Sequence, residues 1–377
     1  MLKGTVMSFD FLAQALPGVQ QLAPYVPGKP ADELARELGL PLDSIVKLAS
    51  NENPLGPSPK VIAAISQAVP ELTRYPDGNG FVLKQALAQK FAVELAQVTL
   101  GNGSNDILEL VAKAWLAPGL NAVFSQHAFA VYPIATMAVG AECREIPANN
   151  YGHDLPAILA AIDANTRVVF IANPNNPTGT WFDQQALADF LAQVPEHVIV
   201  VLDEAYIEYA EPGELPDGMD FLAKHANLIV SRTFSKAYGL AALRIGYAIS
   251  SPMIADVLNR IRQPFNVNSL GLVAAVAALE DEEYLQESRA SNKQGLQQLS
   301  TAFDRLGLSY IESRGNFIAV DFARDAAPIN QALLEQGVIV RPVAGYAMPT
   351  FLRVSVGTEQ ENARFIEVLE QVLADAK

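Results

Sequence analysis

The amino-acid sequence predicts an α/β protein in which a large domain with a mainly parallel central sheet is followed by a smaller α/β domain. Between residues 51 and 263, short apolar runs rich in β-branched residues alternate with amphipathic stretches. Buried strands separated by helices are typical of a parallel sheet that is covered on both faces. A second series of helical and strand-like segments follows Pro264. The length of 377 residues is sufficient for two domains.

The large domain, which we assign to residues 49–265, contains five predicted strands. The apolar runs lie at residues 122–124, 167–171, 198–202, 228–230 and 245–249. Stretches such as 107–115 and 184–193 place apolar residues three and four positions apart, which is the spacing of a helix with one buried face. In open α/β sheets, ligands bind beyond the carboxyl ends of the strands. Functional residues are therefore expected directly after these runs.

The segments on either side of the large domain are different in character. Residues 1–48 combine turn-forming prolines with one short helical pattern at 32–38, which predicts an N-terminal arm that packs with the small domain. Residues 266–377 predict the small domain. Its expected helices are 269–279, 284–306, 328–336 and 359–374, and its expected strands are 317–321, 338–341 and 352–356. A cleft between two such units is the default place for a ligand.

Composition excludes several classes of protein. The 26 basic and 41 acidic residues give a net charge of −15, which is unsuited to nucleic acid because phosphate neutralisation supplies much of that affinity. No apolar run approaches the roughly 20 residues of a membrane helix, and residues 1–18 lack the features of a signal peptide. The single cysteine, Cys143, excludes an internal disulfide, and the four histidines fit no metal-site spacing. We therefore expect a cytoplasmic protein that binds no nucleic acid, membrane or metal.

Polar residues follow three of the predicted strands. Asn176 lies in a run of prolines and asparagines after the second strand, Asp203 and Tyr206 follow the third, and Lys236 follows the fourth. Each has a simpler explanation when taken alone, since an aspartate after a strand is commonly a helix N-cap and asparagine and proline are turn formers. The carboxyl ends of parallel strands meet at one edge of a sheet, so we expect these side chains to gather.

Together these side chains meet the needs of pyridoxal phosphate. The pyridine nitrogen requires a carboxylate (Asp203), the ring hydroxyl requires hydrogen bonds (Tyr206 and Asn176), and the aldehyde requires an amine whose pKa is depressed (Lys236). The cofactor phosphate requires a helix N-terminus, hydroxyl groups and a cation. Residues suited to that part of the cofactor are Ser104, Asn105, Ser235 and Arg244, and Phe129 is placed after the first strand to stack on the ring.

Several motifs resemble the fold-type I aminotransferases that depend on pyridoxal phosphate, and more narrowly the histidinol-phosphate aminotransferase family. The resemblance is carried by residues 48–54, 74–78, 101–106, 173–179, 203–206, 231–247 and 352–358. It implies that Lys236 joins the cofactor covalently and moves the proton at the substrate α-carbon. It also implies amino transfer between histidinol phosphate and 2-oxoglutarate in histidine biosynthesis, with a small-molecule amino donor and keto acceptor as partners.

The resemblance assigns further residues to the site. Tyr75 matches a tyrosine that reaches the cofactor phosphate of the neighbouring subunit, which implies a homodimer with shared active sites. Arg353 resembles the arginine that holds the anionic group of the substrate, and Arg341, Tyr25 and Asn53 resemble further substrate contacts.

Other functions remain open from the sequence. An aromatic amino-acid aminotransferase shares the same motifs, and a decarboxylase of a phosphorylated amino acid uses the same scaffold. A dinucleotide-binding protein is disfavoured because the glycine-rich run at 101–104 is not G-x-G-x-x-G.

Overall fold

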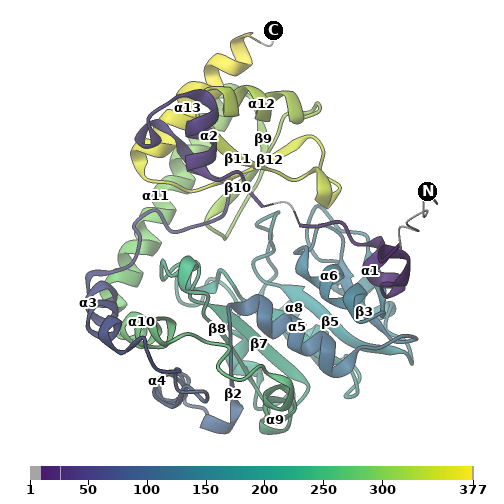
Figure 1. Ribbon diagram of the computed structural model, residues 1–377. Coiled ribbons are helices and arrows are strands. Elements are labelled where there is room, and N and C mark those ends of the chain that lie inside the picture. Colours follow the sequence, from purple (N-terminus) through teal and green to yellow (C-terminus); the bar gives the residue numbers. More distant parts are fainter. Residues whose placement is uncertain (1–9, 26, 376–377) are drawn as a thin grey trace, which may run out of the picture.

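The computed structural model describes residues 10–25 and 27–375, and the larger of its two sheets has seven strands (Figure 1). Their order is β2 (Val98–Gly101), β8 (Gly246–Ser250), β7 (Leu228–Thr233), β6 (Ile199–Asp203), β5 (Thr166–Ala172), β3 (Asn121–Ser125) and β4 (Glu142–Ile146). The pairings from β7 to β4 are all parallel, which confirms the predicted mainly parallel sheet. Strand β8 is antiparallel to both of its neighbours. The segment between β7 and β8 holds only the short η7 (Ala241–Leu243), whereas a parallel return needs a longer crossover.

Both faces of this sheet are buried, as the continuous apolar runs predict. In β5, Val168 and Phe170 pack in one apolar core with α5 (Ser104–Trp115), α6 (Val131–Ala138) and α9 (Pro252–Ile261). Val169 and Ile171 point the other way and pack with α7 (Leu155–Ala160) and α8 (Gln184–Leu191). Successive side chains on a strand point to opposite faces, so a strand covered on both sides needs apolar residues at every position.

The smaller unit is built on a five-stranded sheet. Its order is β1 (Val46–Leu48), β11 (Val338–Pro342), β12 (Phe351–Ser355), β10 (Phe317–Asp321) and β9 (Ser309–Ile311). Strand β1 is parallel to β11, and the other pairs are antiparallel. Helices α11 (Glu282–Leu306), α12 (Ala327–Glu335) and α13 (Glu359–Asp375) cover this sheet through a separate apolar core. The predicted second α/β unit is therefore present.

The N-terminal segment and the helices near residue 265 connect the two units. Helix α1 (Pro17–Gln21) contacts α6 of the larger unit, whereas α2 (Ala31–Leu38) and β1 pack with the smaller one (Figure 1). Helix α10 (Ser269–Leu279) contacts α3 (Pro59–Ala68) and α4 (Phe81–Phe91). The division of the chain at residues 48 and 265 stays a prediction. The remaining short helices are η1 (Leu12–Gln14), η2 (Leu42–Ser44), η3 (Val69–Glu71), η4 (Leu95–Gln97), η5 (Ile207–Tyr209), η6 (Gly218–Phe221) and η8 (Ala344–Tyr346).

Among the described residues, no helix combines the length and the apolar character that a bilayer crossing requires.

Candidate active site

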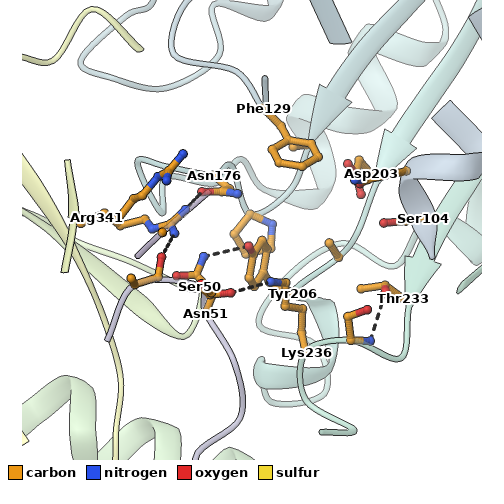
Figure 2. A pocket seen from close by; sticks show the side chains of 18 of the residues that line it. Ser50, Asn51, Ser104, Phe129, Asn176, Asp203, Tyr206, Thr233, Lys236 and Arg341 are labelled. Carbon is orange, nitrogen blue, oxygen red and sulfur yellow. Dashed lines mark hydrogen bonds between the residues drawn. The ribbon is translucent and has the colours of Figure 1, made fainter. Parts of the chain in front are cut away.

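A cavity lies where the carboxyl ends of β5, β6 and β7 face the smaller unit (Figure 2). It is lined by all of the predicted site residues except Asn53 and Tyr75. The predicted residues that line it are Tyr25, Ser104, Asn105, Phe129, Asn176, Asp203, Tyr206, Ser235, Lys236, Arg244, Arg341 and Arg353. Lining residues that the sequence did not single out include Ser50, Asn51, Thr233 and Tyr346.

Asp203 is the last residue of β6 and is 5% exposed. Its Oδ2 atom accepts a hydrogen bond of 2.9 Å from the Tyr132 hydroxyl, whereas its buried Oδ1 atom has no hydrogen-bond partner among the described residues. Burial raises the pKa of Asp203 to about 6, against the opposing effect of the Tyr132 hydrogen bond. A buried carboxylate oxygen without a partner is costly unless a donor reaches it. The protonated nitrogen of a pyridine ring is a donor of the required kind.

Tyr132 is a site residue that the sequence reasoning missed. It lies in α6, and its fully buried ring stacks on Phe170 with centroids 4.9 Å apart and planes 7° apart. This packing aims the hydroxyl at Asp203, which is 71 positions away in the chain. A buried tyrosine hydroxyl normally finds a polar partner, but the sequence carries no signal of which one.

Lys236 follows β7 and lines the cavity. It donates a hydrogen bond of 3.1 Å to the Ser50 carbonyl and lies 5.6 Å from the centroid of the Tyr206 ring. Burial, together with a smaller effect of the Arg353 guanidinium, lowers the pKa of Lys236 to about 7. A lysine with such a pKa holds much of its amine in the neutral, nucleophilic form near pH 7.

Two hydrogen-bonding side chains, Tyr206 and Asn176, are held in place beside Lys236. The Tyr206 hydroxyl accepts a hydrogen bond of 2.9 Å from Asn51, and burial raises the pKa of Tyr206 to about 12. The Asn176 carbonyl oxygen accepts a hydrogen bond of 2.5 Å from Arg353 (Figure 2). This leaves the NH₂ end of the Asn176 amide for another partner. Both groups can therefore donate to an oxygen on a bound ring.

The end of the cavity that is formed by Ser104, Ser235 and Arg244 is suited to a phosphate. Helix α5 begins at Ser104, so its free backbone N–H groups face the cavity beside Ser235 and Arg244. Arg244 donates a hydrogen bond of 3.1 Å to the Ser235 hydroxyl. Gly103 precedes the helix with φ of +80°, and a Cβ atom there would lie 2.4 Å from Nη2 of Arg244. Glycine is required at this position both by the backbone angle and by the approach of the guanidinium.

Arg353 and Arg341 give the cavity a second cationic end. Arg353 is 6% exposed, donates a hydrogen bond of 2.6 Å to the Ala49 carbonyl, and has a buried Nε atom without a partner. Arg341 lies over the Tyr25 ring, 5.2 Å from its centroid. Within the described part of the chain, neither arginine has a carboxylate within 4.0 Å. A buried guanidinium without a carboxylate is costly, so an anionic ligand is expected here.

Asn53 and Tyr75 lie outside the cavity. Asn53 is 9% exposed and hydrogen bonds to the Ala237 carbonyl and to side chains of α11. Tyr75 is 83% exposed and stacks on Phe265 with centroids 4.8 Å apart. Neither has a contact with the cavity within this chain, so the roles that the resemblance implies for them stay predictions.

The residues of the cavity fit pyridoxal phosphate. The unpartnered Oδ1 atom of Asp203 suits the ring nitrogen, the amine of Lys236 suits the aldehyde, and Arg244 with the start of α5 suits the phosphate. No group of three or more histidine, cysteine, aspartate or glutamate side chains in the described residues could hold a metal ion.

Comparisons with known proteins agree with this site. The sequence profile of the family "Aminotransferase class I and II" matches residues 43–369. "Histidinol-phosphate aminotransferase 2" of Pseudomonas fluorescens (strain Pf0-1) is 72% identical over 368 residues, covering 98% of this chain and 100% of that protein. "Histidinol-phosphate aminotransferase" of Stutzerimonas stutzeri is 60% identical over 371 residues, covering 97% of this chain and 100% of that protein.

The crystal structure of histidinol-phosphate aminotransferase from Sinorhizobium meliloti in complex with pyridoxal-5′-phosphate is similar to the whole chain. Its TM-score is 0.88 and its identity 31%, covering 99% of this chain and 100% of the other. Aspartate aminotransferase from Thermus thermophilus has the same fold, with a TM-score of 0.80 at 22% identity, covering 94% of this chain and 98% of the other.

The fold, the cavity and the matched profile define an aminotransferase of class I and II, an enzyme that depends on pyridoxal phosphate. Within that class, the chain belongs to the histidinol-phosphate aminotransferase family. The resemblance stated from the sequence motifs is therefore confirmed.

Proposed function

We propose that this enzyme transfers the amino group between histidinol phosphate and 2-oxoglutarate, in histidine biosynthesis. The observation that supports this most directly is the cationic end of the cavity, where Arg353 and Arg341 have no carboxylate partner among residues 10–25 and 27–375. Both substrates carry an anionic group at a distance from the reacting carbon, a phosphate ester in one and a carboxylate in the other. The identity of 72% to the named relative supports the same substrate.

Each side chain of the cavity has a separate role in the proposed reaction. Pyridoxal phosphate, when bound, supplies an electron sink for the carbon that carries the amino group. Asp203 would hold the proton on the ring nitrogen, and Tyr132 orients that carboxylate through its hydroxyl. Tyr206 and Asn176 would donate to the ring oxygen. Lys236 would hold the cofactor, and its amine, once freed, would move the proton at the substrate α-carbon.

The low pKa of Lys236 serves this proton transfer. A general base is most effective when its pKa lies near the working pH, and the amine of Lys236 has a pKa of about 7. Phe129 lies across the cavity from Tyr206 (Figure 2) and would stack on the cofactor ring. Ser104, Asn105, Ser235 and Arg244 would hold its phosphate.

An aromatic amino-acid aminotransferase is the second candidate, because Tyr25, Phe129 and Tyr346 give the cavity an aromatic lining. A comparison of kcat/KM for histidinol phosphate, phenylalanine and tyrosine, with 2-oxoglutarate as the acceptor, separates the two functions. We expect histidinol phosphate to be preferred by at least about 10²-fold, the scale of a strong differential interaction with the transition state. Equal or higher kcat/KM for phenylalanine would reject histidinol phosphate as the substrate.

We further propose a cytoplasmic homodimer in which Tyr75 completes the site of the partner subunit. Tyr75 is one of several exposed large apolar side chains on or near α3 and α4, two helices that both contact α10. The others are Ile62, Val69, Leu72, Phe81, Val82 and Phe265. Exposed apolar patches commonly mark interfaces between proteins. A sedimentation experiment that found only monomers at micromolar concentration would reject this assembly.

A further inference from the structure

We propose that Asn53 is a positioning residue for Lys236 and does not touch the substrate. Its side chain connects the Ala237 carbonyl to helix α11 through hydrogen bonds. The inference rests on the proposed role of Lys236 in holding the cofactor. It replaces the substrate contact that the family resemblance implies for this asparagine.

The Asn53 side chain is the centre of a buried hydrogen-bond network. Its Nδ2 atom lies 2.8 Å from the Ala237 carbonyl oxygen, 2.8 Å from the Ser288 hydroxyl and 3.1 Å from the Tyr284 hydroxyl. Its Oδ1 atom accepts a hydrogen bond of 3.0 Å from the backbone N–H of Leu55. Asn53 and Tyr284 are each 9% exposed and Ser288 is 2% exposed, so water competes little for these groups.

Each hydroxyl group in this network has a backbone carbonyl as its acceptor. The Ser288 hydroxyl donates to the Ala237 carbonyl at 3.1 Å, and the Tyr284 hydroxyl donates to the carbonyl of Gly56. Both hydroxyl oxygens are therefore left as acceptors toward Asn53. The Asn53 amide therefore presents its NH₂ group on this side, where its two N–H donors are shared among three acceptors, the two hydroxyls and the Ala237 carbonyl. An aspartate has the same shape but, when ionised, cannot donate.

The same segment of chain contacts both Lys236 and the residue that follows it. Ser50 accepts the hydrogen bond of the Lys236 amine, and Asn53 holds the carbonyl of the next residue, Ala237. The loop after Lys236 is also tightly packed. At Gly239, which has φ of +70°, a Cβ atom would lie 2.3 Å from the carbonyl oxygen of Gly56. Residues 50–56 thus contact the Lys236 amine through Ser50 and the loop after Lys236 through Asn53 and Gly56.

Helix α11 extends this connection to the smaller unit. Tyr284 and Ser288 belong to its first turns, whereas Leu299 and Phe303 near its other end pack in the core of the smaller sheet. Figure 1 shows α11 running from the neighbourhood of α3 and α10 up to that sheet. The smaller sheet also carries Arg353 on β12. The network therefore links the Ala237 carbonyl, one residue after Lys236, to a helix that packs on the sheet that bears Arg353.

The test compares holoenzymes of Asn53→Ala, Asn53→Asp and Ser288→Ala with the wild type. Asn362→Ala is the matched control, since Asn362 is also a buried, hydrogen-bonded asparagine but lies in α13 and bonds to Gly357 and Gln298 instead of Ala237. The measurements are kcat, KM for the amino donor, and hydrogen exchange at the backbone amides of Gly239 and Leu240. Those two amides are hydrogen bonded to the carbonyls of Lys236 and Phe234.

We expect kcat of Asn53→Ala to fall at least about tenfold while KM stays within about twofold, because the displaced group acts on the reacting proton and not on the substrate anion. Exchange at Gly239 and Leu240 should accelerate at least about tenfold. Asn53→Asp should be more severe, and Ser288→Ala, which keeps the Asn53 bond, should be intermediate. If both Asn53 variants fail to fold, Ser288→Ala alone carries the test.

Two results would overturn the proposal. A KM raised at least about tenfold with unchanged kcat would restore Asn53 as a substrate contact. Unchanged kcat and exchange in Asn53→Ala and Ser288→Ala, or equal changes in Asn362→Ala, would leave the network with a packing role only. The exchange measurement needs no substrate, so a wrong substrate assignment would not affect it. A wild type that binds no pyridoxal phosphate would show instead that the role proposed for Lys236 is wrong.

Discussion

The protonation of Lys236 is the property of this site that can be tested most quantitatively. With a pKa of about 7, about half of the amine is neutral at pH 7. A fully solvated lysine, with a pKa of about 10.4, is neutral to only about 0.04% at that pH. The cavity therefore increases the concentration of the reactive amine on the order of 10³-fold.

Replacing Arg353 with methionine tests the electrostatic part of this effect. The variant keeps much of the buried volume but removes a positive charge that lowers the pKa of Lys236. The pKa should rise by roughly one to two units, the size expected for two charges about 6–12 Å apart at an effective dielectric constant of about 20. It should not return to the ordinary value, because burial is the larger cause and remains.

The assay is stopped-flow absorbance of pyridoxal phosphate capture by the cofactor-free enzyme as a function of pH. The rate should rise with pH as the amine loses its proton, with a midpoint near 7 in the wild type and a higher midpoint in Arg353→Met. Arg260→Met is the control, since Arg260 is an exposed arginine paired with Asp256, and it should leave the midpoint unchanged. A wild-type midpoint near 10, or equal midpoints in wild type and Arg353→Met, would refute the reasoning.

Three further predictions concern binding, stability and assembly. Arg353→Ala should raise KM for anionic amino donors at least about tenfold while cofactor affinity changes little, and unchanged kinetics with glutamate would remove Arg353 from the substrate site. Glu208→Gln should stabilise the enzyme above pH 7 by on the order of 1–3 kcal/mol and have little effect near pH 4 in thermal unfolding. Burial raises the pKa of Glu208 to about 7, so the folded state holds this proton more tightly than the unfolded state. The stability of the wild type is therefore lost as pH rises through about 4 to 7. An equal change in stability of Glu208→Gln at both pH values would contradict this. Mixing Tyr75→Ala with Lys236→Ala subunits should restore about a quarter of wild-type activity, because half of the dimers formed would be mixed and each would hold one intact site, whereas no recovery would mean that sites are not shared.

The core of the site could be predicted because it follows from topology. Asp203 ends β6 and Lys236 follows β7, and these neighbouring strands are parallel, so residues at their carboxyl ends meet at the same edge. The apolar runs that mark such strands are visible in any sequence whose sheet is buried on both faces. The same reasoning placed Asn176 after β5, which also lies in the parallel part of the sheet.

Other parts of the site depend on contacts between distant segments. Tyr132 bonds Asp203 across 71 positions, and Asn51 bonds Tyr206 across 155. Neither pairing has a local signal, because the side chains meet only after the sheet and its helices have packed. Asn53 is similar: its motif is recognisable, but its partners on α11 are known only from the fold.

Strands without a long apolar run were also missed. Strand β4 (Glu142–Ile146) lies at the edge of the large sheet and contains two glutamates and an arginine, since it is only partly covered. Strand β1 has three residues, with Lys47 at its centre. Short or edge strands need few apolar side chains, so hydrophobic periodicity does not reveal them.

The central claim is that Lys236 carries the cofactor opposite Asp203. Reduction of the purified holoenzyme with borohydride, followed by peptide mapping with mass spectrometry, locates the lysine to which pyridoxal phosphate is joined. The account predicts one phosphopyridoxyl group on the peptide that contains Lys236, and none in Lys236→Ala. A label on another lysine, or a wild type that carries no label, would contradict it.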